Sequence, residues 1–308
     1  MSMQLKYNII LLLSLVVLLT ACRQDELPSL PTAGDEVELT AVIDGSANRV
    51  SQTGDNRYAF DPGDTIQVVA WIGALEPVPA DKWWINSLNT FNGRKWTATP
   101  YMRWQNGDGL QHHFRSWWPA QLASPTSDDL HHVSHSVTET YNPDILVART
   151  SLARPADNRL SLHFTHLLSR FDVRLRFIEH FTGISDITVA AHVALGAELD
   201  LMEGTVQCGT TRGALALSEV VAGNGVYWSG TQIIIPQECA DCVITLAFMA
   251  NGTEHQLQYV HPSLLFESGK RTTLTLLVSK EEIKVVSASV TPWIESPSLG
   301  DTDAEETI

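Results

Sequence analysis

The sequence predicts an all-β fold built from β-sandwiches. Short apolar segments alternate with polar residues at a period of two, as in residues 171–177, where apolar and charged side chains take turns. Gly, Asn, Asp and Pro separate these segments, and no helical period continues beyond two turns. Many short strands without long helices favour sandwiches over α/β folds.

The chain begins with features of an exported lipoprotein. Lys6 precedes the apolar stretch Ile9–Leu19, which is too short to span about 30 Å of hydrocarbon but has the size of a signal-peptide core. The stretch closes on Leu19-Thr20-Ala21-Cys22, which resembles a bacterial lipobox. We therefore expect residues 1–21 to be a signal peptide, Cys22 to carry lipid that anchors the protein without a transmembrane helix, and residues 22–35 to be a tether.

Composition separates this chain from nucleic-acid-binding proteins. Its formal net charge is −15, with no basic patch to contact phosphates. Hydrophobic residues make up 44% of the chain, and its 308 residues are enough for two domains. The sequence therefore predicts an exported globular protein that does not bind nucleic acid.

The first predicted strand is Glu36–Ile43, whose inward positions are Val37, Leu39, Ala41 and Ile43. Further predicted strands are Thr65–Trp71, Phe171–Phe177, Ile187–Val189, Ile233–Ile235, Val243–Leu246 and Leu274–Val278. The one exception to the β pattern is Pro79–Leu88, where Trp83 and Trp84 are expected on a helical turn.

The centre of the chain contains a break in side-chain alternation. Apolar positions from Leu160 to Leu168 are even-numbered, whereas those from Phe171 to Phe177 are odd-numbered. A continuous strand cannot bury both sets on one face, so a break is expected within Leu167–Arg170. We place an N-terminal domain at 36–159, a C-terminal domain at 160–295 and an acidic tail at 296–308.

Several segments together resemble the fimbrillin-like lipoproteins of Bacteroidetes, the subunits of type V pili. The residues that carry the resemblance are Phe60–Val68, Trp117–Ala120, Asp144–Ala148, Leu162–Phe171 and Val290–Trp293. The resemblance implies two stacked Greek-key β-sandwich domains and a place in a fimbrium. The polar Arg23–Glu26 after Cys22 similarly resembles the export tags of lipoproteins on the outer face of the outer membrane.

The resemblance also implies a mode of assembly with other fimbrial subunits. In this family, cleavage after an arginine removes the lipid and the first strand, and a strand from another subunit fills the groove. Arg49 best matches the processing position, and Arg57 is a second candidate. The family's C-terminal donor corresponds to Ile283–Trp293. Alternatively, both arginines are ordinary loop residues on an anchor subunit that stays lipidated. Stalk, tip and anchor roles remain open.

A second hypothesis is a monomeric surface lipoprotein that binds glycans through its N-terminal domain. Seven of the nine tryptophans precede residue 160. Such rings can stack on sugars or simply fill a core, and core filling is the more common use.

Motifs for catalysis are missing, so no enzyme activity, cofactor or metal is predicted. The sequence contains no G-x-S-x-G, H-E-x-x-H, P-loop or G-x-G-x-x-G motif. The pairs His112-His113 and His131-His132, with His135, are interpreted as loop histidines on a solvated face, because adjacent strand residues cannot easily share one ion. His166 lies on an apolar face and is interpreted as a core or junction histidine.

The cysteines give no clear redox motif. Cys239 and Cys242 form a C-x-x-C between two predicted strands, without the βαβ pattern of thioredoxin-like proteins. A turn disulfide that leaves Cys208 unpaired and three free thiols are equally compatible with the sequence.

Overall fold

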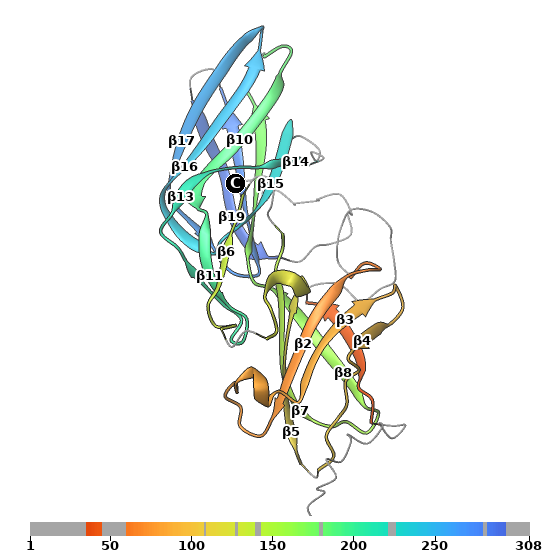
Figure 1. Cartoon of the computed structure of the whole chain (residues 1–308). Helices are drawn as coiled ribbons and strands as arrows, with labels where there is room; N and C mark the ends of the chain where they lie inside the picture. Colours follow the sequence, from red (N-terminus) through yellow and green to blue (C-terminus); the bar gives the residue numbers. More distant parts are fainter. Residues whose placement is uncertain are drawn as a thin grey trace, which may run out of the picture.

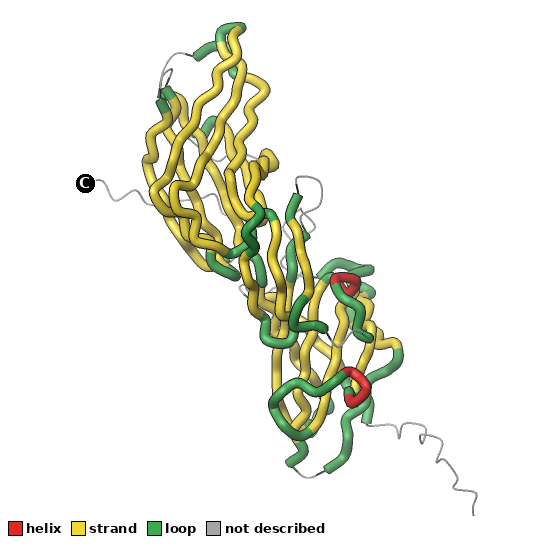
Figure 2. The backbone as a smooth tube through the Cα atoms, turned by 60° about the vertical axis from the view of Figure 1, so that its left-hand side comes forward, coloured by secondary structure: helices red, strands yellow, loops and turns green. Residues whose placement is uncertain are grey.

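The computed structural model describes residues 35–44, 60–107, 109–126, 129–138, 143–178, 181–220, 226–279 and 282–293. Its strands confirm the all-β sandwich class. The molecule is elongated, with the N-terminal and C-terminal halves arranged end to end (Figures 1 and 2). Neither described helix, η1 (Ala80–Lys82) or η2 (Ala120–Leu122), is long enough to cross a membrane.

The N-terminal half is built mainly on one seven-stranded sheet with the order β1-β8-β7-β5-β2-β3-β4. This sheet curls so that its two ends approach each other. Phe60 lies between them and contacts both Phe164 of β8 and Trp96 of β4, with ring centroids 5.3 and 5.0 Å away. The strands of this half are β1 (Glu38–Ile43), β2 (Thr65–Ile72), β3 (Ile85–Phe91), β4 (Trp96–Thr99), β5 (Gln111–Trp118), β6 (Val133–Ser136), β7 (Leu146–Ala153) and β8 (Arg159–His166).

The C-terminal half packs a four-stranded sheet, β13-β10-β16-β17, against a five-stranded sheet, β14-β15-β9-β18-β19. A third sheet, β12-β11-β6, joins the two halves, since β6 comes from the N-terminal half (Figure 1). The strands are β9 (Ser169–Phe177), β10 (Ser185–Ala194), β11 (Gly196–Asp200), β12 (Thr205–Cys208), β13 (Arg212–Ala216), β14 (Ser218–Val220), β15 (Trp228–Ile234), β16 (Gln237–Ala250), β17 (Thr253–Phe266), β18 (Lys270–Val278) and β19 (Ile283–Pro292).

Two hydrophobic cores hold these sheets together. The β1 core lies inside the curled sheet and contains residues such as Val37, Ile43 and Phe164. The large core fills the C-terminal half and continues across the junction, where Trp71 of the N-terminal sheet shares it with Phe171. Because one apolar core spans both halves, their relative position is fixed by packing as well as by the connecting chain.

The expected break in alternation is confirmed. Strand β8 ends at His166 and β9 begins at Ser169, so Leu167 and Leu168 form the connection, and both are buried. The chain changes sheet at these residues, whereas the sequence places the domain division at residue 160. Phe164 is buried in the β1 core and Phe171 in the large core, each with no exposed surface.

The expectation for Pro79–Leu88 is wrong in its details. The helical turn η1 is only three residues long and ends before Trp83, and the chain enters strand β3 at Ile85. The isoleucine is buried against the β1 core, which favours an extended chain over a continued helix.

Candidate functional site

Strand β1 forms one edge of the seven-stranded sheet and pairs with β8 in parallel, from Glu38 opposite Arg159 to Ile43 opposite Phe164. The backbone ladder continues at the end of the strand, where Asp44 N donates to Phe164 O at 2.7 Å. Before β1, Val37 N donates to Met102 O at 3.0 Å. Backbone contacts therefore fix β1 at both ends.

The inward face of β1 is the one expected from the sequence. Val37 and Ile43 are buried, and Leu39 and Ala41 are half-buried, all packed on the β1 core. By contrast, the charged contacts of the strand are exposed, as in the ion pair between Arg159 and Glu38 at 3.2 Å. Apolar burial and the backbone ladder are thus what hold β1, because exposed ion pairs add little.

Strand β8 depends on β1 for most of its pairing. On its other side it pairs with β7 at three positions, Phe164, Thr165 and His166. Within the described strands, the stretch from Arg159 to His163 has its ladder partner in β1 alone. Removal of β1 would therefore leave an unpaired backbone edge above the buried side chains of Leu160, Leu162 and Phe164.

The predicted lipidation and processing residues, Cys22, Arg49 and Arg57, lie outside the described residues. So do the signal peptide and the tail at 296–308. Arg49 and Arg57 both fall in the chain segment 45–59, which connects the end of β1 to Phe60. A single cut in that segment would separate β1 from the rest of the chain.

The predicted donor segment, Ile283–Trp293, contains β19, which is an edge strand of the other half of the molecule. It pairs antiparallel with β18 at the edge of the five-stranded sheet, and the register shifts between Thr275 and Leu276. Ile283 is buried and Val285 packs on the large core. Beyond the shift, every side chain from Val286 to Pro292 is exposed. Little side-chain packing therefore holds this part of β19.

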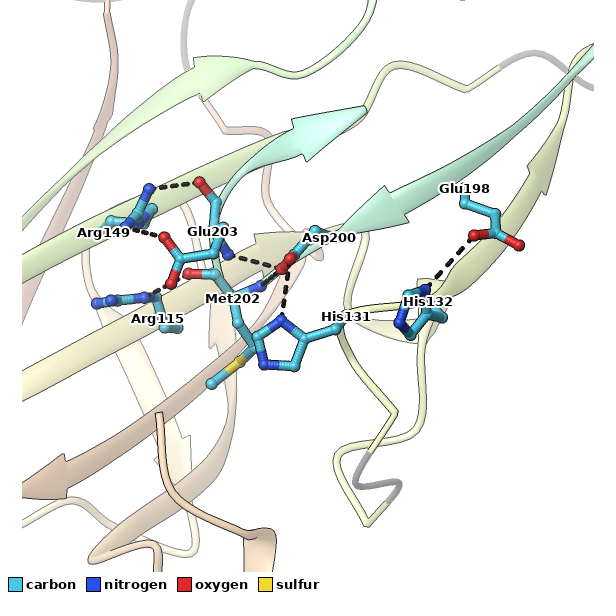
Figure 3. Close-up of polar contacts among 8 residues, drawn as sticks. All are labelled: Arg115, His131, His132, Arg149, Glu198, Asp200, Met202 and Glu203. Atoms are coloured by element: carbon cyan, nitrogen blue, oxygen red, sulfur yellow. Dashed lines mark hydrogen bonds and ion pairs between the residues drawn. The ribbon is translucent and has the colours of Figure 1, made fainter. Parts of the chain in front are cut away.

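The two halves also meet through a polar contact at the β11–β12 turn (Figure 3). The guanidinium of Arg115, buried in β5, donates from Nε to Met202 O at 2.6 Å and lies 4.9 Å from the Trp71 ring. Arg149 of β7 pairs with the Glu203 carboxylate at 2.7 Å. These contacts hold the turn against the N-terminal sheet, so their role is structural.

The loop interpretation of the histidines is correct only for two of them. His131 and His132 contact Asp200 and Glu198 at 2.9 and 3.4 Å on the surface (Figure 3). The interpretation is wrong for the three others, His112 and His113 in β5 and His135 in β6, because these strands bury them. Within the described residues, no group of three or more metal-ligating side chains is placed to hold an ion.

Burial has a direct consequence for two of these histidines. Loss of solvation lowers the pKa of His112 and of His135 from the usual value, because a charged imidazole is poorly accommodated in the interior. In each ring one nitrogen, Nδ1 of His112 and Nε2 of His135, is buried without a hydrogen-bond partner. They act as core residues.

Cys239 and Cys242 lie within strand β16, not in a turn between strands. Asp241 has a positive φ of 48°, and the alternation of buried positions in β16 changes at this residue, so that both thiols are buried while the register with β17 is unchanged. Burial raises the pKa of Cys242 and of Cys208. All three cysteines of the described chain are free thiols.

Most tryptophans of the N-terminal half serve as packing residues. Trp71, Trp104 and Trp117 are buried. Trp84 is the exception, with 45% of its surface exposed, and its Nε1 donates to Arg103 O at 2.7 Å. Tyr101, also half exposed, lies with its ring 5.4 Å from the Arg103 guanidinium.

The sequence model of the fimbrillin-like family matches residues 49–293, and the chain belongs to this family. The matched region begins after β1 and ends with Trp293. Family membership makes the chain a structural, non-enzymatic subunit of the fimbrial and adhesive type.

Solved structures with the same fold include proteins from several Bacteroides species. A proposed cell adhesion protein from Bacteroides ovatus is 14% identical, with a TM-score of 0.63, covering 85% of this chain and 99% of its own. Another from Bacteroides uniformis is 18% identical, with a TM-score of 0.59, covering 86% and 100%. A fimbrial protein from Bacteroides vulgatus is 10% identical, with a TM-score of 0.52, covering 84% and 99%. No curated protein sequence matches the chain.

Proposed function

We propose that this chain is a surface-exposed lipoprotein precursor of a fimbrial subunit, assembled by strand exchange after proteolytic removal of β1. The observation that carries the proposal is the position of β1: an edge strand that covers a buried core and provides most of the pairing of β8. Such a strand can leave the sheet as one piece, and the groove that it leaves can accept a strand from another subunit.

The segments outside the described residues have assigned roles in this proposal. Cys22 carries the lipid and holds the precursor in the outer membrane. Cleavage after Arg49 then releases the anchor together with β1. The groove exposes unpaired backbone and apolar side chains that cannot stay bare in water. The strand Ile283–Trp293 of a neighbouring subunit fills it, and head-to-tail repetition produces a filament.

Limited proteolysis of the purified, soluble precursor tests the processing step. A trypsin-like protease should produce oligomers, detected by size-exclusion chromatography and electron microscopy. Under conditions that leave Arg57 uncut in the wild type, Arg49→Ala should block them, whereas Arg57→Ala, the matched control in the same segment, should not. Cleaved protein that stays monomeric at high concentration would contradict assembly and would favour a lipidated anchor.

Two further variants separate the anchor from the donor. Metabolic labelling with a palmitate analogue should mark the wild-type precursor and not Cys22→Ala, and equal labelling of both contradicts lipidation. Deletion of residues 282–308 should leave cleavage intact but stop filament growth. Circular dichroism of the truncated protein shows whether it is folded, so that a loss of growth can be assigned to the missing strand.

A glycan-binding role is the second candidate, favoured by Trp84 and Tyr101. Both rings are about half exposed, and both are held in place by Arg103 through the contacts described above. Fixed aromatic rings offer amphipathic contact area with a small loss of side-chain entropy. If this patch binds sugars, Trp84→Ala should abolish binding to an immobilised glycan panel, whereas the exposed-residue control Leu75→Ala should not.

A further inference from the structure

Three residues from distant parts of the sequence meet where the two halves join. The Trp293 indole is stacked on the His166 imidazole, with ring centroids 4.0 Å apart and an interplanar angle of 11°. His166 Nδ1 is 2.7 Å from Asp144 Oδ2. Trp293 is 6% exposed, and the His166 side chain is 8% exposed. We call Trp293, His166 and Asp144 the Trp293 latch.

The latch fixes the end of a strand that is otherwise loosely packed. From Val286 to Pro292 the side chains of β19 are exposed, so the backbone ladder to β18 is what holds this stretch. Trp293 follows directly and is buried, and its backbone N donates to Gly269 O at 2.8 Å. An edge strand without buried side chains opens easily, so its opening depends strongly on what anchors the end.

The other side of the latch is the end of β8, the strand that would border the groove left by β1. His166 is the last residue of β8 and pairs with Leu146 of β7, close in sequence to Asp144. The rest of β8, from Arg159 to Phe164, pairs with β1. The latch therefore joins the end of β19 to the end of β8, next to the stretch of β8 that loses its partner when β1 is absent.

We propose that the Trp293 latch is an autoinhibitory contact that keeps the C-terminal strand on its own subunit until β1 has been removed. This inference rests on the proposed function. Loss of β1 removes the ladder partner of Arg159 to Phe164, so that only the pairing with β7 at Phe164, Thr165 and His166 still holds the end of β8 on which Trp293 is stacked. Opening of the groove thereby favours release of the donor, and an uncleaved precursor does not donate its strand prematurely.

Hydrogen exchange on the uncleaved, soluble precursor tests the latch itself. His166→Ala removes the stacking partner but leaves the donor sequence intact. It should speed exchange of the β19 amides about tenfold, because loss of a buried aromatic pair reduces the cost of local opening. Trp293→Leu should do the same and serves as a second variant if His166→Ala does not fold. Unchanged protection of β19 in a folded variant overturns the proposal.

His255→Ala is the matched control. It removes a comparable stack, between His255 and Phe248, with centroids 5.0 Å apart and an angle of 13°, in another part of the C-terminal half. Exchange in β19 should stay at the wild-type rate in this variant. Equal acceleration of β19 by the control would show a general loss of stability and would overturn the proposal.

Assembly kinetics separate this proposal from the function on which it rests. After cleavage, His166→Ala should form oligomers with a shorter lag than wild type. If no variant and no wild-type protein forms oligomers, the proposed function fails, and faster β19 exchange still reports a latch on the C-terminal strand. If wild type assembles but neither exchange nor lag changes in His166→Ala, the latch proposal fails and the function stands.

Discussion

Strands β1 and β19 are both edge strands, but their sequences give them opposite relations to the core. In β1, alternate side chains face the β1 core, and the buried pair Val37 and Ile43 marks its two ends. In β19, the side chains beyond Val285 face solvent on both sides of the strand. An edge strand can therefore be fixed by its inward face or held mainly by its backbone ladder.

This difference indicates which strand is costly to lose. Removal of β1 exposes apolar surface and an unpaired edge of β8, so the remaining subunit needs a replacement strand. Release of most of β19 exposes little that is not already in water, apart from Trp293 and Ile283 at its ends. The groove is therefore under a strong driving force to be filled, and the donor is comparatively free to move.

The largest expected effect tests whether the two cores are equally important. Phe164→Ala in the β1 core and Phe171→Ala in the large core should each lower the free energy of unfolding by about 3–5 kcal/mol, because both rings are completely buried. Chemical denaturation measures this loss. Only Phe164→Ala should also speed hydrogen exchange in β1, and unchanged midpoints would show that these rings are not core residues.

A smaller effect compares the two edge strands directly. Ile43→Ala in β1 should cost about 2–3 kcal/mol of unfolding free energy, since the side chain is 7% exposed and packs on the β1 core. Val290→Ala in β19 should change it by less than about 0.5 kcal/mol, since 42% of that side chain is exposed. Similar losses for the two variants would contradict the proposed difference between the strands.

The pH dependence of stability tests the burial of His112 in β5 and His135 in β6. The pKa of His112 and of His135 is lower in the folded chain than the unfolded value of about 6.5, so the unfolded state takes up protons first as the pH falls. The unfolding free energy should therefore decrease below about pH 6.5, by at most about 1.4 kcal/mol per pH unit for each histidine. In His135→Gln the slope between pH 6.5 and 5 should be smaller, and an unchanged slope in this variant would contradict the assignment.

The smallest effect concerns the charges on the outer face of β1. Glu38→Gln removes the ion pair with Arg159, in which both side chains are more than 60% exposed. The free energy of unfolding should change by less than about 0.5 kcal/mol, because such pairs are screened by water. Thermal unfolding beside Ile43→Ala gives the comparison, and a larger loss for Glu38→Gln would mean that charge, not burial, holds β1.

The sequence by itself determined the all-β class, the inward face of β1 and a break in alternation within Leu167–Arg170. These features depend on alternation along the chain, which the backbone translates directly into faces of a strand. The family resemblance rested on short motifs such as Phe60–Val68, and the match over residues 49–293 confirms it. Cys22 and Arg49 stay predictions, because they lie outside the described residues.

Only the tertiary structure decided which polar residues are buried. His112, His113 and Cys239 looked like loop residues, but they lie in strands β5 and β16 with their side chains buried. The Trp293 latch likewise could not be read from the sequence, because Asp144, His166 and Trp293 are brought together by the way three strands end at the junction. Alternation specifies which side chains share a face, but contacts between distant segments depend on how the sheets pack.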